Sequence, residues 1–163
     1  MRRQPRPDRR SGDRPGRGPS GEAAEHALSF EQAWERFAYY IEKVCELQAT
    51  EPAVADVVSG RYPAADCLMA VCGRAQDSGT RIIERTQLAG AVRRDFTVKD
   101  LLLFFGTNAL LARAVADTTP VARRRQVGFL LDGLSAETAQ EAISVVPLTP
   151  QRMYDVMGRL AAP

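Results

Sequence analysis

The chain has 163 residues, of which 45% are hydrophobic and 26% are charged, and these values predict one globular domain with its own core. The formal net charge of +2 is unevenly distributed. Seven arginines fall within residues 1–20 against only Asp8 and Asp13. The rest of the chain therefore carries an excess of acidic groups, and an acidic body does not attract nucleic acid by itself.

The residue types that carry most enzyme and metal chemistry are scarce. The one histidine, His26, lies near the N-terminus, and the three cysteines, Cys45, Cys67 and Cys72, lack the paired spacing of a disulfide or zinc framework. No phosphate-binding glycine loop and no metalloprotease or serine-hydrolase motif is present. We expect no catalytic residues, no bound metal and no cofactor. The protein is thus expected not to be an enzyme.

Neither targeting nor membrane signals are visible. The basic N-terminus is followed by no apolar stretch of the kind found in a secretory signal. The most apolar run, 101–116, is interrupted by polar residues and is too short to span a bilayer. We expect a cytoplasmic protein without a membrane partner.

Residues 1–28 differ in composition from all that follows. They are rich in Arg, Pro and Gly and show no apolar periodicity, so they cannot bury enough surface to offset the entropy of ordering and are predicted to form a disordered leader. Three interpretations remain open: an inert tail, a basic arm that contacts phosphates nonspecifically, or the product of a misassigned start site. The domain itself is predicted to cover residues 29–163.

From residue 29 onward the pattern is helical. Ser29 followed by Gln32 resembles a capping box, and apolar residues at three- and four-residue spacing then continue to about residue 48. A short helix over 53–58 follows, then a long one over 64–89 that ends at Gly90. The middle of that long helix contains Ser78-Gly79, which could loosen or bend it.

The second half of the chain continues in the same way. Thr97 and Asp100 form a further capping pattern at the start of a very apolar helix over 98–116. Helices are also predicted over 120–133, more weakly over 135–144, and over 150–160, with an extended stretch at 145–148. No segment alternates with the period of a strand, so the fold class is all-α, a bundle of two or three long helices and several short ones.

The helix over 98–116 is apolar on two sides, which is typical of a helix that is central in the core or shared with another subunit. Together with the helix that follows, it predicts a homodimer through a four-helix interface. The expected interface residues are Leu103, Gly106, Leu110, Arg113, Ala114, Val127, Leu130, Leu131 and Leu134. The alternative is that both faces are covered within one chain.

A cluster of aromatic residues suggests a site for an apolar ligand. The expected ligand-binding residues are Trp34, Phe37, Tyr40, Phe105 and Asn108. Asn108 is included because a buried amide must find a hydrogen-bond partner, whether a neighbouring backbone, a partner subunit or a ligand. The same aromatic residues could equally form an ordinary core.

The order of these segments resembles TetR/AcrR-like transcriptional regulators. The segments on which the resemblance rests are FEQAWERF (Phe30–Phe37), IIERTQLAGAVRRDFTVKDLLLFF (Ile82–Phe105), ADTTPVARRRQVGFLLDGL (Ala116–Leu134) and PLTPQRMYDVMGRL (Pro147–Leu160). The resemblance implies the family's C-terminal regulatory bundle, which dimerises through its last two long helices and binds a small-molecule effector among the long helices.

Residues 1–28 are too short and too rich in Pro and Gly to form the helix-turn-helix head that precedes this bundle in the family. We therefore expect a truncated regulator that keeps the sensing and dimerisation core, with an unknown effector and without direct sequence-specific DNA binding. Two alternatives are a module that heterodimerises with a full-length relative, and a nonspecific DNA-associated protein acting through its basic arm.

Overall fold

The computed structural model describes residues 18–51, 65–119, 121–139 and 141–161, without the side chains of 65–72, 74, 75, 154 and 161. Six helices lie in these ranges: α1 (Pro19–Leu28), α2 (Ala33–Thr50), α4 (Ala65–Leu88), α5 (Val98–Val115), α6 (Val121–Leu134) and α7 (Pro150–Ala161). Within the same ranges the only β pairing is an isolated bridge between Val92 and Ser135. The prediction of an all-α fold is confirmed.

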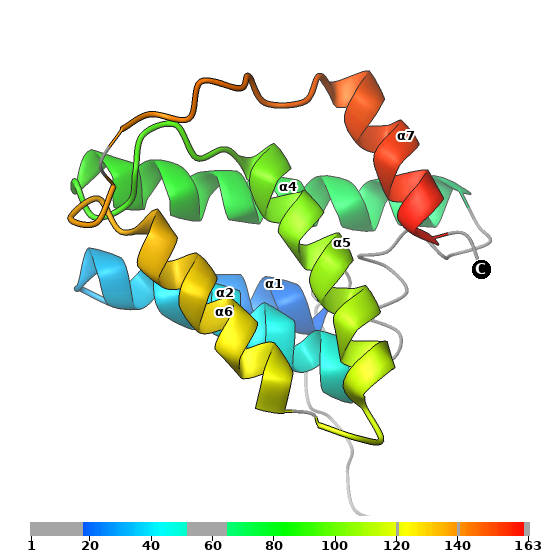
Figure 1. The fold of residues 1–163 in the computed structure, drawn as a ribbon. Coiled ribbons are helices and arrows are strands. Elements are labelled where there is room, and N and C mark those ends of the chain that lie inside the picture. The colour runs from blue at the N-terminus through cyan, green and yellow to red at the C-terminus, as the bar shows by residue number, and fades with distance from the viewer. Residues whose placement is uncertain (1–17, 52–64, 120, 140, 162–163) are drawn as a thin grey trace, which may run out of the picture.

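The packing centres on α2, α4 and α5. Figure 1 shows α6 on one side of α5 and α7 on the other, with α1 and α2 lying along the same side of the bundle as α6. A single cluster of buried side chains joins α1, α2, the end of α4, the α4–α5 turn, α5 and α6, and it includes Phe37, Ile41, Ile82, Leu101 and Leu131.

The boundary predicted for the disordered leader is wrong. Residues 19–28 form α1, which begins at Pro19 and buries Ala23, Ala24 and Ala27 against α2 and α4. Alanine gives a weak hydrophobic signal, but its small side chain allows close helix packing. Residues 1–17, and with them most of the predicted basic arm, lie outside the described residues.

The expected helix start at Ser29 is also wrong. Ser29 is the last residue associated with α1, where its hydroxyl donates a hydrogen bond to the His26 carbonyl at 2.6 Å. The helix α2 begins four residues later, at Ala33. The region from 29 to 32 is a tight connection between two helices, because α1 occupies the chain where a leader was expected.

The two boundaries around the α4–α5 turn are confirmed. Gly90 has a φ of +72°, the left-handed conformation that favours glycine just after a helix. Thr97 and Asp100 form a reciprocal capping box at the start of α5, in which the Thr97 backbone N–H donates to the Asp100 carboxylate at 2.8 Å. Both signals are local in sequence and local in structure.

Other predictions met different outcomes. The expected weak helix over 135–144 is wrong for the described part of that range, which forms a turn over 136–138 and then irregular chain. The expected helix over 53–58 lies outside the described residues. The final helix is confirmed as α7. No helix in the described ranges is both long and apolar enough to cross a membrane.

The helix α7 packs on α5 (Figure 1). Gly106 of α5 lies at this contact. A Cβ atom placed on Gly106 would lie 3.1 Å from Leu160 Cδ1 and 3.2 Å from Met157 Cε. Gly106, which was expected at the dimer interface, is thus covered by α7 of the same chain.

Replacing Gly106 with glutamine should undock α7 and leave the bundle folded. The new side chain would occupy the space of Met157 and Leu160, while glutamine is roughly 0.5–1 kcal/mol better than glycine in a helix interior. Amide hydrogen exchange of residues 150–161 should accelerate by about tenfold or more. The matched control is Gly128→Gln in α6, which meets nothing within 4 Å; equal exchange in both variants would contradict the prediction.

Candidate functional site

The interior between α2 and α5 brings together most of the residues predicted to bind a ligand. Phe37, Tyr40, Phe105 and Asn108 are all buried, and Trp34 is partly buried against the same cluster. The Tyr40 and Phe105 rings meet edge to face with centroids 6.2 Å apart. Trp34 instead contacts Phe37 at 6.0 Å, and Phe37 meets Phe96 at 6.1 Å. The aromatic residues therefore form two groups along α2.

A chain of amide hydrogen bonds crosses this interior. Gln48 donates from Nε2 to the Phe105 carbonyl at 3.0 Å, and Asn108 donates from Nδ2 to Gln48 Oε1 at 2.6 Å. Both side chains are buried, and Asn108 is 0% exposed. Among the described residues the chain ends there, because Asn108 Oδ1 is buried and accepts no hydrogen bond.

Tyr40 places a hydroxyl beside the same interior. Tyr40 is 2% exposed, and its hydroxyl forms no hydrogen bond with any part of the chain that the structure describes. Gly79 of α4 lies beside it, since a Cβ there would be 3.8 Å from the hydroxyl oxygen and 3.3 Å from Leu101. Burial raises the pKa of Tyr40 well above its usual range, so the phenol is neutral at physiological pH.

A buried cation lies between α2 and α6. Arg123 is buried and donates from Nη1 to the Cys45 carbonyl at 2.7 Å. The Cys45 thiol is itself buried, and burial raises its pKa to about 12 even though the nearby Arg123 lowers it. A thiol with this pKa stays protonated near neutral pH, so Cys45 is a core residue without nucleophilic character.

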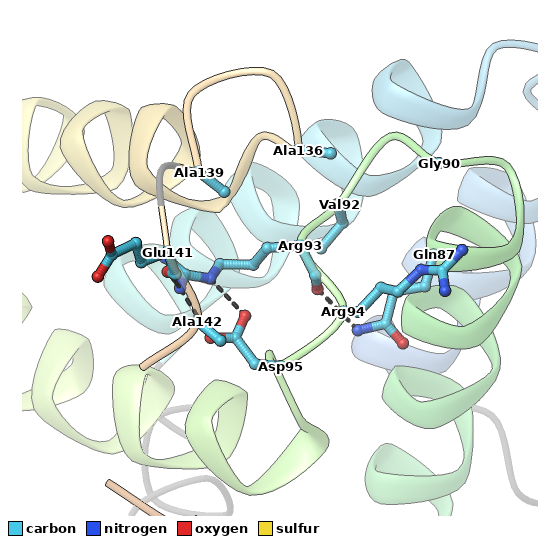
Figure 2. A pocket seen from close by; sticks show the side chains of 10 residues that line it. All are labelled: Gln87, Gly90, Val92, Arg93, Arg94, Asp95, Ala136, Ala139, Glu141 and Ala142. Carbon is cyan, nitrogen blue, oxygen red and sulfur yellow. Dashed lines mark hydrogen bonds and ion pairs between the residues drawn. The ribbon is translucent and has the colours of Figure 1, made fainter. Parts of the chain in front are cut away.

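An open pocket of about 510 Å³ lies between the α4–α5 turn and the segment after α6. Its lining includes Gln87, Arg93, Asp95, Ala139 and Glu141 (Figure 2). Arg93 donates to both oxygens of Asp95, at 2.6 and 2.7 Å, and to the Glu141 carbonyl at 2.9 Å. The Arg93 and Asp95 side chains are therefore engaged with each other and with the backbone, which is typical of a structural clip.

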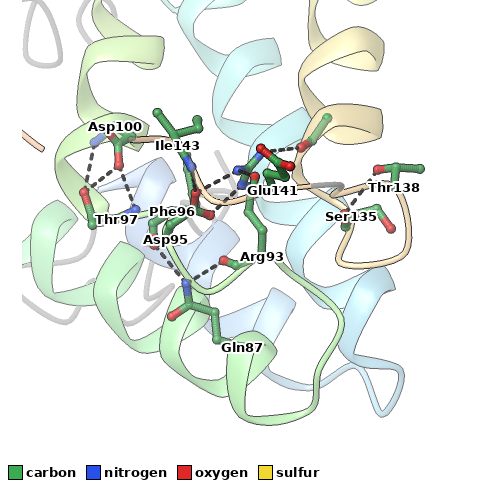
Figure 3. Close-up of polar contacts among 11 residues, drawn as sticks. Gln87, Arg93, Asp95, Phe96, Thr97, Asp100, Ser135, Thr138, Glu141 and Ile143 are labelled. Carbon is green, nitrogen blue, oxygen red and sulfur yellow. Dashed lines mark hydrogen bonds and ion pairs between the residues drawn. The ribbon is translucent and has the colours of Figure 1, made fainter. Parts of the chain in front are cut away.

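Figure 3 shows how Arg93 and Asp95 connect the α4–α5 turn to the segment between α6 and α7. Asp95 also accepts a hydrogen bond from the Ile143 backbone N–H at 2.7 Å, and Gln87 donates to the carbonyls of Arg93 and Phe96. The hydrogen bond from Arg93 holds the pKa of the Asp95 carboxyl well below its usual range. We call Arg93 and Asp95 the clip; it anchors the chain that leads from α6 to α7.

The structure places the predicted interface residues in three environments. Val127, Leu131 and Leu134 lie in the chain's own core, and Gly106 is covered by α7. Leu103, Leu110 and Leu130 are half-buried, and Arg113 and Ala114 are exposed. The first four therefore pack inside the chain rather than on a surface that a second chain would meet.

Two buried polar residues that contact α2 or lie on it, Gln48 and Arg123, were not among the predicted site residues. Gln48 continues the stripe of Ile41 and Val44 at helical spacing, so a polar residue in an apolar stripe was an available signal. Arg123, 78 residues from its partner Cys45, gave no comparable sign. The described residues contain no group of three or more His, Cys, Asp or Glu side chains able to hold a metal ion.

A comparison with protein families finds a match over most of the helical bundle. Residues 31–136 fit the family described as transcriptional regulator SbtR-like, C-terminal domain, a TetR-type regulatory domain. The chain belongs to this family. The match runs from just before α2 to just after α6, so α7 and most of the segment leading to it lie beyond the matched residues of this TetR-like regulatory domain. A comparison with curated proteins finds no match.

Proposed function

We propose that this TetR-like domain is a small-molecule sensor that works as a homodimer, with the effector bound between α2, α4 and α5. The observation that carries the proposal is Asn108 Oδ1, a polar atom that is fully buried and has no partner among the described residues. Such atoms are rare in folded proteins because each costs free energy, and they need an explanation. A bound molecule that donates to Asn108 supplies one.

The surroundings of Asn108 suit a mostly apolar molecule. Tyr40, Phe105 and Leu101 lie in the same interior, and ligand sites in proteins are largely apolar with a few convergent polar groups. In a sensor of this kind, an effector shifts the population between two arrangements of the helices. The residues proposed to contact it are Trp34, Phe37, Tyr40, Phe105 and Asn108.

Binding can be tested with the neutral fluorescent probe N-phenyl-1-naphthylamine. The chain has a single tryptophan, and Trp34 lies beside the proposed site with its ring 6.0 Å from Phe37, so energy transfer from Trp34 reports binding there. We expect saturable binding of about one probe per chain. Weak binding that rises without saturation would contradict a defined site.

The dimer is proposed to form through the exposed face of α6 and the adjoining end of α5. Two apolar side chains of α6 are largely exposed to solvent: Phe129 is 63% exposed and Val121 is 65% exposed. Apolar surface of this kind often marks a contact with another protein. The Arg125 guanidinium covers the Phe129 ring at 4.8 Å. Arg113 and Ala114, both exposed, lie near the end of α5.

A Phe129→Glu substitution should dissociate the dimer. A carboxylate buried among apolar side chains is poorly solvated, so the dissociation constant should rise by about tenfold or more. The matched control is Leu88→Glu, because Leu88 is 88% exposed and lies on α4 rather than on α6. Light scattering after size exclusion measures the mass; a monomeric wild type, or a dimer unaffected by Phe129→Glu, would contradict the assignment.

A further inference from the structure

We infer that the effector is an electrically neutral molecule with an apolar body and two hydrogen-bonding groups, a donor that meets Asn108 Oδ1 and an acceptor that meets the Tyr40 hydroxyl. The inference rests on the proposed sensing function and adds the chemistry of the ligand. It is built from the direction of the hydrogen bonds in the interior and from the positions of the charged groups around it.

The direction of the amide chain makes Asn108 an acceptor. The Phe105 carbonyl can only accept, so Gln48 must present its NH₂ group there and its oxygen toward Asn108. Asn108 must then donate to that oxygen with its own NH₂ group. Its oxygen is consequently the free end of the chain, and only a donor can satisfy it.

Tyr40 supplies the complementary group. Its hydroxyl is a neutral phenol, which donates a hydrogen bond and has no partner in the described ranges. Tyr40 and Gln48 lie on neighbouring parts of α2, and both contact Phe105 of α5, one through its ring and the other through its carbonyl. A ligand in this interior therefore meets a donor and an acceptor that are separated by an aromatic wall.

Two arginines that contact α2 or lie on it have hydrogen-bond partners outside the Tyr40–Asn108 interior. Arg123, buried on the α6 side of α2, donates to Cys45. Arg36 donates to the Phe30 carbonyl at the α1–α2 connection, and burial raises the pKa of Tyr40. A charged ligand would lose its hydration here without gaining an opposite charge.

The test compares three probes of similar size: benzamide, benzoate and ethylbenzene. Benzamide is neutral and carries both a donor and an acceptor, benzoate is charged, and ethylbenzene has neither group. Trp34 fluorescence and the melting temperature report binding. We expect benzamide to bind more tightly than either of the other probes, by about fivefold to tenfold, as expected for one or two hydrogen bonds.

Tyr40→Phe isolates the donor. It removes a hydroxyl that makes no hydrogen bond in the described part of the protein, so the melting temperature should stay the same or rise while benzamide binds about fivefold to tenfold more weakly. Tyr39→Phe is the matched control, because Tyr39 lies next in α2 and packs on Phe30 and His26. Benzamide affinity should not change in that control.

The double variant Gln48→Met/Asn108→Leu separates a ligand role from a structural one. Replacing both partners with apolar residues of similar size leaves no polar group unpaired. We expect a melting temperature equal to or above that of the wild type and loss of the preference for benzamide over ethylbenzene. A lower melting temperature would mean that the amide pair serves stability, which overturns the inference.

The outcomes also distinguish the inference from the proposed function. If ethylbenzene binds as tightly as benzamide, if benzoate binds best, or if Tyr40→Phe leaves benzamide affinity unchanged, the ligand chemistry is wrong and the sensing site stands. If none of the three probes binds at millimolar concentration, both the ligand chemistry and the sensing site are overturned.

Discussion

Replacing Phe37 with alanine should lower the free energy of unfolding by about 3–5 kcal/mol, the usual cost of deleting a buried aromatic side chain. Phe37 is 0% exposed and lies in α2 at the centre of the core. Its ring meets Phe96 of the α4–α5 turn edge to face and contacts Trp34. The deletion therefore leaves a cavity bordered by two elements that are distant in sequence.

Urea denaturation followed by far-ultraviolet circular dichroism measures this loss, because the described fold is helical. The melting temperature should fall by about 10 °C. Leu88→Ala is the control, since Leu88 is almost fully exposed, and it should change the stability by less than about 0.5 kcal/mol. A Phe37→Ala variant as stable as this control would show that α2 is not packed as described.

Removing the Asp95 carboxylate should release the segment that carries α7. Asp95→Ala leaves the Arg93 guanidinium and the Ile143 N–H without their shared acceptor. The expected loss is about 2 kcal/mol, because hydrogen bonds to charged groups that are partly shielded from water are the stronger ones. Protease cleavage within residues 135–149 should become faster, since their remaining ties to the α4–α5 turn are few.

The exposed pair of Lys43 and Glu46 is the control for this experiment. It has a similar length, 2.8 Å, but both side chains are more than a third exposed. Lys43→Ala should leave the stability nearly unchanged, as is usual for surface ion pairs. If Asp95→Ala and Lys43→Ala have equal effects on cleavage, the clip does not anchor the segment.

The clip also predicts a dependence of stability on pH. The pKa of Asp95 is depressed in the folded protein, so its contribution is fully present above the unfolded pKa of about 4. It is lost as the pH falls below that value toward the folded pKa. Below a pH of about 4, the melting temperature should therefore fall more steeply with decreasing pH in the wild type than in Asp95→Asn. Near neutral pH, the slope of the melting temperature against pH should be the same in both proteins.

Local chemistry in the sequence was enough to predict most helix boundaries. Gly90 ends α4 because only a residue without a Cβ easily adopts its left-handed φ. Thr97 and Asp100 cap α5 because their side chains reach backbone groups three residues away. These interactions lie within one helical turn, so residues that are close in the sequence are enough to predict them. The match to a TetR-like regulatory domain over residues 31–136 agrees with the segments that suggested the family.

The prediction of the core from hydrophobic residues failed where small residues are buried in it. The three buried alanines of α1 follow a segment rich in Arg, Pro and Gly, and their weak hydrophobicity placed the predicted domain start too late. Periodicity assigned Val127, Leu131 and Leu134 to an apolar face correctly, but it could not say whether that face meets another chain or, as found, the protein's own core.

By itself the sequence determined the all-α class, the family, the helix ends marked by caps, and the aromatic stripe of α2. The tertiary structure alone decided that Asn108 meets Gln48 across 60 residues, that Arg93 and Asp95 hold a segment 48 residues away, and that α7 covers Gly106. The physical reason is range: caps and stripes depend on neighbours within a turn or two, whereas the partner of a buried polar group depends on how the helices pack.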